Sequence, residues 1–273
     1  MKKLTLIGIL VLALIFTTSA FAQRVGGGKH GVDVWEIMTY GPENDYTVPI
    51  SYPVTKSGGG VAFDLYIHSG SPDRAMLVVD DLTEIKGFHG GNLTGEALSA
   101  KIAIEAKPGT TFMSFNNDGN GTLPGNKWAD PGGFVRLYFN KVGTTGCPDG
   151  WHPERPDCEA QYWWSNPLHI DLQDLAALGK KGIKLEVPLD PAFWSDRDGD
   201  MGDTGPGDVC WGAVPADCMY VDHSAAFAEA VANVKKIGLS FGGNGWWAFG
   251  VGASAPGAMF KLNSFEVKKV HYK

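Results

Sequence analysis

A glycine-rich stretch, residues 196–208, carries five aspartates, and carboxylates at this density can bind a hard cation. Like charges this close repel one another unless water or a cation separates them, and calcium prefers oxygen ligands. The spacing is not that of an EF-hand, because the turn glycines are Gly199 and Gly202 and the twelfth position is Gly207. We therefore expect a bound calcium ion that stabilises the loop, with a solvated acidic loop as the alternative. The predicted metal ligands are Asp196, Asp198, Asp200 and Asp203.

Two doubled tryptophans, Trp163-Trp164 and Trp246-Trp247, raise the question of what the second indole of each pair does. Successive side chains of a β-strand point to opposite faces, so only one indole of each pair can enter a given core. Alternation of the neighbouring apolar residues predicts that Trp164 and Trp247 are buried and that Trp163 and Trp246 point outward. Packing alone is the alternative role for the outward rings.

An outward aromatic surface beside polar side chains suits a sugar, whose faces are apolar and whose rim is hydroxyl. In residues 134–140 the apolar alternation leaves Arg136 and Tyr138 on the face away from the core. The predicted ligand-binding residues are Arg136, Tyr138, Trp163, Trp246, Trp128 and Trp151. The expected partner is therefore a polysaccharide or another glycan.

Two patterns could indicate an enzyme, and both are weak. Residues 238–242, GLSFG, match the G-x-S-x-G nucleophile pattern, but that motif needs a strand before it and a helix after it. Here a predicted helix comes first, and His271 is the only histidine after the serine. A glycosidase needs two positioned carboxylates. Candidates on or beside predicted strands are Asp64, Asp80, Asp81, Glu84, Glu105 and Glu186. We expect a non-catalytic protein, with a polysaccharide-degrading glycosidase or lyase as the alternative.

Residues 1–22 have the composition of a secretory signal peptide: two lysines, a short apolar run, and a small-x-small cleavage site at Ala20-Phe21-Ala22. The apolar run is shorter than the roughly 20 residues that span a bilayer, and no later run approaches that length. We therefore expect a secreted or periplasmic protein without a membrane span. The mature chain is expected to be one domain, residues 23–273, with a flexible start at residues 23–31.

Charge and cysteine content agree with export. The formal net charge is −7, and removal of the two lysines of residues 1–22 makes it −9, so nucleic acid is not an expected partner. The four cysteines have no C-x-x-C spacing, and an exported chain favours disulfides over reduced thiols or a metal site. The expected pairs are Cys147 with Cys158 and Cys210 with Cys218, because each pair brackets a short segment that contains proline and glycine.

Short runs with a period of two predict that most of the chain forms β-strands. These runs include VDVWEIM, GVAFDLYIH, LSAKIAIEA, FVRLYFN, LHIDL, IKLEVPL and MFKLNSFEV. One helix is expected over residues 223–236, where Phe227, Ala230, Val231 and Val234 form an apolar stripe. The fold class predicted from these patterns is all-β, an antiparallel β-sandwich with one short helix. Long loop insertions are expected at residues 116–133, 141–160 and 194–220.

A succession of motifs lies between about residues 93 and 267: VRLYFN, YWWSNP, LEVPLDPAFWSD, VANVKKIGLSFGG, WWAFGVG and FKLNSFEV. In these motifs the chain resembles a group of exported bacterial proteins that have jelly-roll domains of the carbohydrate-binding-module or galactose-binding-like kind. The resemblance implies a jelly-roll β-sandwich that binds glycans, although the cysteine-bearing insertions depart from it. We expect a secreted carbohydrate-binding protein if the aromatic surface is exposed. A surface or matrix protein with a structural role is the alternative if that surface is covered.

Overall fold

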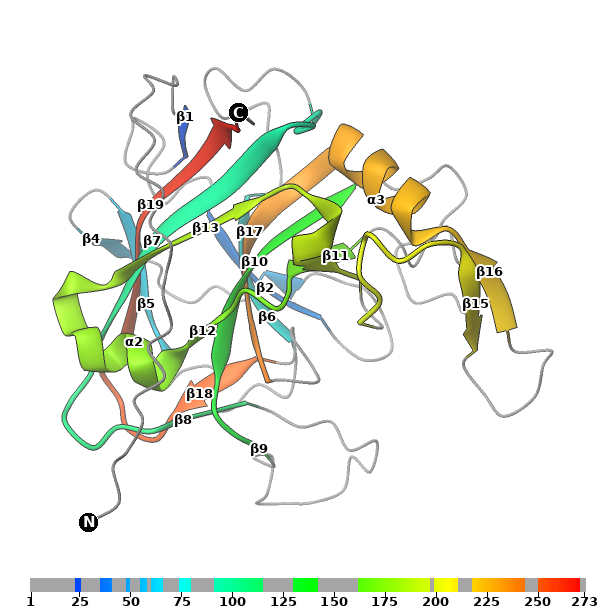
Figure 1. Cartoon of the computed structure of the whole chain (residues 1–273). Coiled ribbons are helices and arrows are strands. Elements are labelled where there is room, and N and C mark those ends of the chain that lie inside the picture. The colour runs from blue at the N-terminus through cyan, green and yellow to red at the C-terminus, as the bar shows by residue number, and fades with distance from the viewer. Residues whose placement is uncertain are drawn as a thin grey trace, which may run out of the picture.

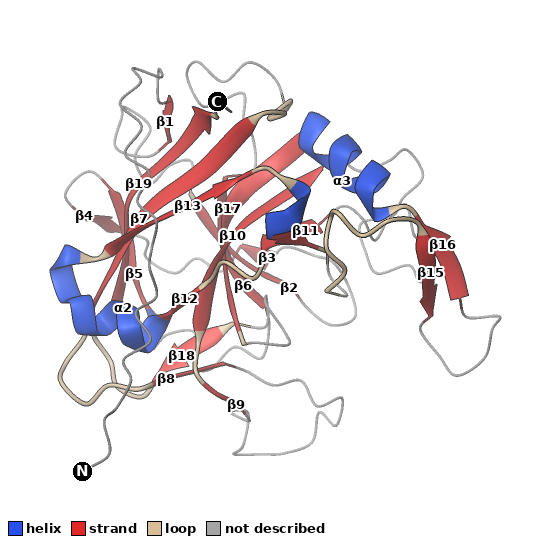
Figure 2. Cartoon of the chain, in the orientation of Figure 1, coloured by secondary structure: helices blue, strands red, loops and turns tan. Residues whose placement is uncertain are grey.

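Antiparallel β-sheets make up most of the part of the chain that the structure describes (Figure 1, Figure 2). The structure is a computed structural model. It describes residues 23–25, 35–40, 48–49, 55–57, 60–65, 74–79, 91–114, 130–141, 162–196, 199–210, 218–243 and 250–270. Within these ranges there are two α-helices, so the all-β fold class is confirmed.

One sheet has six strands and is organised around the long strand β19. Its order is β13 (Ile183–Pro188), β7 (Glu96–Glu105), β19 (Met259–Lys269), β5 (Gly60–Asp64) and β4 (Thr55–Ser57), and β1 (Gln23–Val25) also pairs with β19. All of these pairings are antiparallel. The ladder between β19 and β7 is interrupted by an irregularity between Leu262 and Ser264.

A second sheet has eight strands, with β10 and β17 at its centre. Its order is β14 (Trp194–Ser195), β11 (Tyr162–Ser165), β10 (Phe134–Lys141), β17 (Val234–Gly242), β6 (Arg74–Val79), β2 (Glu36–Tyr40) and β3 (Val48–Pro49), and β12 (Ile170–Asp171) also pairs with β10. Strand β10 pairs with β11 on one side and with β17 on the other. It therefore lies between the YWWS residues of β11 and the GLSFG residues of β17.

Two smaller sheets complete the described strands. One consists of β18 (Val251–Ala253), β8 (Phe112–Ser114) and β9 (Asp130–Pro131). The other is a hairpin of β15 (Gly207–Cys210) and β16 (Cys218–Val221), which lies beyond the N-terminal end of helix α3 (His223–Ala232) at the right of Figure 1.

The predicted helix is confirmed for its first ten residues. Helix α3 begins after Asp222, whose carboxylate accepts a hydrogen bond from the backbone N–H of Ala225 at 3.0 Å. It ends before Asn233, and Val234 already belongs to β17. The apolar stripe is buried as expected, because Phe227, Ala230 and Val231 all enter the core.

A second helix, α2 (Leu172–Leu178), was not predicted, because LHIDL was interpreted as a strand. Only Ile170 and Asp171 are in a strand, and Asp171 then caps the helix by accepting a hydrogen bond from the backbone N–H of Gln173 at 2.7 Å. Leu172 and Leu175, one turn apart, are buried in the core. Short 3-10 helices follow at Gly179–Lys181 and Pro191–Phe193.

The hydrophobic core lies between the inner faces of the six-stranded and eight-stranded sheets. The ring of Phe241 on β17 lies 4.9 Å from that of Phe260 on β19 and 5.6 Å from that of Phe63 on β5. Strands β10 and β7 also contribute to this core. Both follow the period of two, so alternate residues of each strand enter the core. These residues are Val135, Leu137 and Phe139 on β10, and Leu98, Ala100, Ile102 and Ile104 on β7.

Candidate functional sites

The two adjacent tryptophans of β11 point to the opposite faces of the sheet from those predicted. Trp163, predicted to point outward, has no exposed surface and belongs to the hydrophobic core, where it is paired across the strands with Phe139. Trp164 is on the opposite face and is paired with Tyr138. The prediction was wrong because it extended the alternation backward from Leu168, whereas β11 ends at Ser165 and the strand alternation does not continue through the next residues.

On the outer face of the eight-stranded sheet, β10 and β11 bring together one cation and three aromatic rings, here called the outer-face cluster: Arg136, Tyr138, Tyr162 and Trp164. The ring centroids of Tyr138 and Trp164 are 5.6 Å apart. Tyr162 is stacked near both, with centroid distances of 6.3 Å to Trp164 and 6.4 Å to Tyr138. Arg136 and Tyr138 therefore lie, as the alternation predicts, on the face away from the core.

Most of the outer-face cluster is buried. Arg136, Tyr138 and Trp164 are 1%, 0% and 6% exposed, respectively, and Tyr162 is half-buried. The expectation of an open aromatic platform therefore does not hold for these residues. Of the cluster, Tyr162 is the member that is not buried.

Arg136 is fixed by contacts on more than one side. Its guanidinium Nη1 donates a hydrogen bond to the carbonyl oxygen of Gly243 at 3.1 Å, and its Cζ lies 5.7 Å from the centroid of the Phe134 ring. Burial lowers the pKa of Arg136 to about 10, so the side chain remains a cation at neutral pH. Nearby His169 packs edge to face on Phe134, and partial burial, together with the charge of Arg136, lowers the pKa of this imidazole.

The neighbouring strand β17 carries little side-chain volume beside these residues. Its register with β10 pairs Gly238 with Tyr138 and Ser240 with Arg136. Residues 238–242 are therefore a β-strand that lies within the sheet, and no helix follows directly after Ser240. This position does not match the strand-to-helix turn that a nucleophilic serine of the G-x-S-x-G type requires.

The acidic loop forms a tight turn directly after β14. Asp196 and Asp200 are linked twice: the backbone N–H of Asp196 donates to the carbonyl oxygen of Asp200 at 2.9 Å, and the backbone N–H of Asp200 donates to Oδ1 of Asp196 at 3.0 Å. Gly199, with φ of 97°, allows the chain to reverse between them. The turn therefore places two of the four predicted metal ligands side by side.

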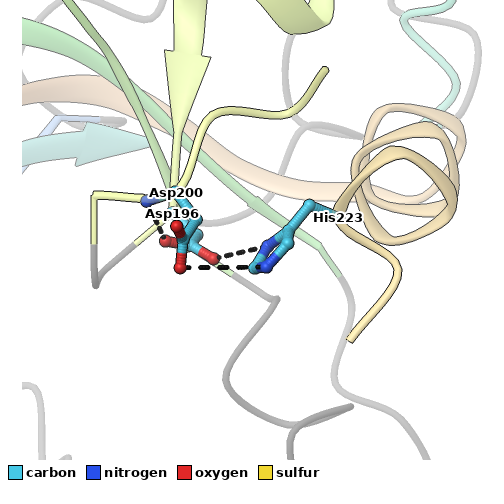
Figure 3. Close-up of side chains that lie close together, drawn as sticks. All are labelled: Asp196, Asp200 and His223. Atoms are coloured by element: carbon cyan, nitrogen blue, oxygen red, sulfur yellow. Dashed lines mark hydrogen bonds and ion pairs between the residues drawn. The ribbon is translucent and has the colours of Figure 1, made fainter. Parts of the chain in front are cut away.

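A histidine from another element completes this group, which we call the Asp-Asp-His cluster: Asp196, Asp200 and His223 (Figure 3). His223 is the first residue of α3. Its Nδ1 lies 3.1 Å from Oδ2 of Asp196, and its Nε2 lies 3.8 Å from Oδ2 of Asp200. The side chains of His223 and Asp196 are 3% and 8% exposed, whereas that of Asp200 is 41% exposed.

The other two predicted metal ligands do not join the cluster in the described part of the chain. Asp203 is exposed, and Asp198 lies outside the described residues. His223 was not among the predicted metal ligands, because in the sequence it is only the start of an amphipathic helix. No local spacing links it to the aspartates, since the contact depends on how α3 packs against the loop.

The remaining predicted residues belong mostly to undescribed parts of the chain. Residues outside the described ranges are Trp128, Trp151, Trp246, Trp247, Cys147 and Cys158, as is the proposed signal peptide, residues 1–22. Cys210 and Cys218 are described by their backbone, which places them directly opposite each other in the β15–β16 hairpin. This register agrees with the predicted pairing, and the disulfide itself stays a prediction.

Comparisons with known proteins provide no family to which this chain can be assigned. No family model, no curated protein and no solved structure matches it. Neither helix in the described ranges has the length and apolar character that a bilayer crossing requires.

Proposed function

We propose that this chain is an exported, non-catalytic carbohydrate-binding protein whose two main sheets form a β-sandwich of the jelly-roll kind. The observation that carries the proposal is the outer-face cluster, in which Tyr138, Tyr162 and Trp164 lie within 6.4 Å of one another beside Arg136. The half-buried ring of Tyr162 supplies apolar surface for the face of a sugar, and its hydroxyl can form hydrogen bonds with the sugar's hydroxyl groups. A glycan is therefore the ligand class that best fits the chemistry of this group.

Tyr162 is the residue of the cluster that we expect to contact a glycan directly. It is half-buried, and its ring is nearly parallel to that of Trp164, with an interplanar angle of 24°. The buried rings of Tyr138 and Trp164 would then hold Tyr162 in position from the sheet side. This arrangement assigns the buried members a supporting role and the half-buried member the contact.

A structural role at a cell surface or in an extracellular matrix is the second candidate. The near-complete burial of Arg136, Tyr138 and Trp164 favours it, because rings that are covered contribute stability and not ligand contact. The two candidates differ in a measurable way. A carbohydrate-binding protein retains a polysaccharide ligand as a monomer, whereas a structural protein assembles with itself or with other chains.

The test is affinity electrophoresis of the protein through gels that contain one soluble polysaccharide each, followed by titration calorimetry with the best ligand. We expect Tyr162→Ala to lose retention while the protein stays folded by circular dichroism. Leu178→Ala is the matched control, because Leu178 is an exposed apolar residue on α2 that does not belong to the cluster. Absence of retention in every gel, combined with self-association in sedimentation velocity, would move the assignment to the structural candidate. Release of reducing sugar from any polysaccharide would instead indicate a glycosidase.

A further inference from the structure

We propose that Asp196, Asp200 and His223 bind a divalent transition-metal ion of the zinc class. The Asp-Asp-His cluster is the group of metal-ligating side chains that the described residues bring together. The inference is independent of glycan binding, because the cluster does not share a residue with the outer-face cluster. It also changes the ion expected from the sequence, where four aspartates predicted calcium.

The three side chains lie near enough for small movements to bring them to the spacing of an occupied site. Ligand atoms of a tetrahedral zinc ion lie about 2.0 to 2.2 Å from the metal, which separates them from one another by about 3 to 4 Å. One atom from each of the three side chains can be chosen so that all of them lie within 4.8 Å of one another. Asp200 is the more exposed of the two acids, so its side chain has room to close the remaining distance.

The donor atoms favour zinc over calcium. Calcium takes six to eight oxygen ligands, whereas imidazole nitrogen is a typical ligand of zinc and of other first-row transition metals. His223 offers this nitrogen from a position that is almost completely buried. A carboxylate–carboxylate–imidazole set is therefore better suited to a small ion with mixed nitrogen and oxygen ligands.

The charge of the cluster also calls for a divalent cation. Asp196 and Asp200 each contribute a carboxylate, and His223 contributes an imidazole nitrogen. A dication at the centre of the three groups neutralises the carboxylates and leaves the imidazole in the neutral form that binds metals.

The ligands are held by well-anchored elements. The buried indole of Trp194, two residues before Asp196, donates a hydrogen bond from Nε1 to the carbonyl oxygen of Pro188 at 2.6 Å. On the helix side, Oγ of Ser224 donates to the carbonyl oxygen of Thr204 at 3.1 Å, which ties the start of α3 to the same loop. Such contacts hold Asp196 and His223 in place and so favour tight binding of the metal.

Close packing between the loop and α3 adds to this anchoring. A Cβ atom placed on Gly202 would lie 2.9 Å from ring atoms of Phe227, so the loop can approach the helix only because this position is glycine. Phe227 itself belongs to the core. The metal would therefore join the acidic turn to α3, and three protein ligands would leave one tetrahedral position for water.

The experiment begins with protein that has been treated with a chelator and then dialysed. Zn²⁺, Co²⁺, Mn²⁺ and Ca²⁺ are titrated separately by calorimetry, and the melting temperature is measured with each ion. We expect one Zn²⁺ per chain, a higher melting temperature with Zn²⁺, and visible absorption bands of tetrahedral Co²⁺. Asp200→Asn should lower Zn²⁺ affinity by more than about 100-fold, because removal of a direct ligand should cost at least as much as removal of its support.

Two matched variants separate the site from general effects of charge or folding. Asp203→Asn removes an exposed acid from the same loop, and His169→Ala removes a histidine outside the cluster, so both should keep the Zn²⁺ affinity of the parent. His223→Ala, like Asp200→Asn, should lose this Zn²⁺ affinity. Equal loss in Asp203→Asn, Zn²⁺ binding that survives both cluster variants, tighter binding of Ca²⁺ than of Zn²⁺, or no ion bound at all would each overturn the proposal.

Discussion

The indole of Trp163 on β11 meets the phenyl ring of Phe227 on α3 edge to face, with ring centroids 5.0 Å apart and an interplanar angle of 86°. This contact joins the helix to the inner face of the eight-stranded sheet. Both residues belong to the core, so the helix is held by burial of apolar surface and not only by its cap. The same helix presents His223 to the acidic loop, so this packing also positions the proposed metal ligand.

Trp163→Ala should lower the free energy of unfolding by about 3 to 5 kcal/mol, because truncation of a fully buried aromatic side chain leaves a cavity in the core. Urea unfolding followed by circular dichroism measures the change. Leu178→Ala, at an exposed position, should stay within about 0.5 kcal/mol of the parent. A small loss in Trp163→Ala would mean that the site tolerates an empty volume or that the indole is not packed as described.

Two glycines after α2 provide a matched pair for the effect of close backbone approach. Gly179 and Gly182 have φ of 54° and 56°, but a Cβ on Gly182 would lie 2.0 Å from the carbonyl oxygen of Ile102, whereas one on Gly179 meets nothing within 4 Å. Gly179→Ala should cost about 1 to 3 kcal/mol from backbone strain alone, because φ of 54° with ψ of −137° is a combination that residues other than glycine rarely adopt. Gly182→Ala should cost about 3 kcal/mol or more, because the chain must also move away from β7. Equal midpoints of urea unfolding for the two variants would contradict this difference.

Glu186 on β13 should make the stability depend on pH. Partial burial acts to raise the pKa of this carboxyl, but hydrogen bonds and charges from Lys184 and Lys268 outweigh it and lower the pKa below its ordinary value of 4.5. A lowered folded-state pKa stabilises the fold above the unfolded-state value, and this contribution disappears as the pH falls through the lowered one. Because the side chain is 42% exposed, screening limits the effect to less than about 1 kcal/mol.

Glu186→Gln tests this dependence through urea unfolding at pH 7 and at pH 3. At pH 7 the variant should be slightly less stable than the parent, and this difference should shrink as the pH falls toward 3, because protonation of Glu186 removes the charge that the lysines stabilise. Addition of 0.5 M sodium chloride should reduce the difference at pH 7. A difference that stays constant from pH 7 to pH 3 would show that packing, and not charge, is responsible.

Cys210 and Cys218 are expected to form a disulfide in protein produced under oxidising conditions. They are directly opposite in an antiparallel hairpin, where the Cα separation of about 4.5 to 5.5 Å falls within the range for disulfides. Peptide mapping without reduction should recover the two cysteines in one cross-linked peptide. A link from either cysteine to Cys147 or Cys158 would contradict the pairing, and free thiols at both positions would remove the disulfide from this hairpin.

Regular alternation made the strands predictable from sequence, as for Val135, Leu137 and Phe139 of β10. Prediction failed where the alternation was continued through Asn166-Pro167, which ends the strand. The chain leaves β11 after Ser165, so alternation continued past this point reversed the assignment of Trp163. The chain enters α2 only two residues after β12 begins, so the helix was not predicted. In retrospect, Asp171 before Leu172 and Leu175 is an N-cap pattern that could have identified α2.

The candidate sites were only partly predictable for a different reason. Asp196 and Asp200 lie in one short loop, so their association follows from their spacing and from a turn glycine. His223 meets them because Phe227 packs against β11 and because Gly202 permits close approach. These are tertiary contacts between segments that the sequence separates, and no local pattern encodes them. Burial of Arg136 and Tyr138 depends in the same way on what covers the sheet.

The central position of β19 in the six-stranded sheet has a consequence for the order in which the protein can fold. Phe260 pairs with Ile104 of β7 on one side and with Phe63 of β5 on the other, and β19 follows all the other described strands along the chain. Until β19 is available, the edges of β5 and β7 that it occupies stay unpaired and open to other chains. Such non-local pairing is slow to form, so assembly of this sheet should be a late step and the one at which the nascent protein is most prone to aggregate.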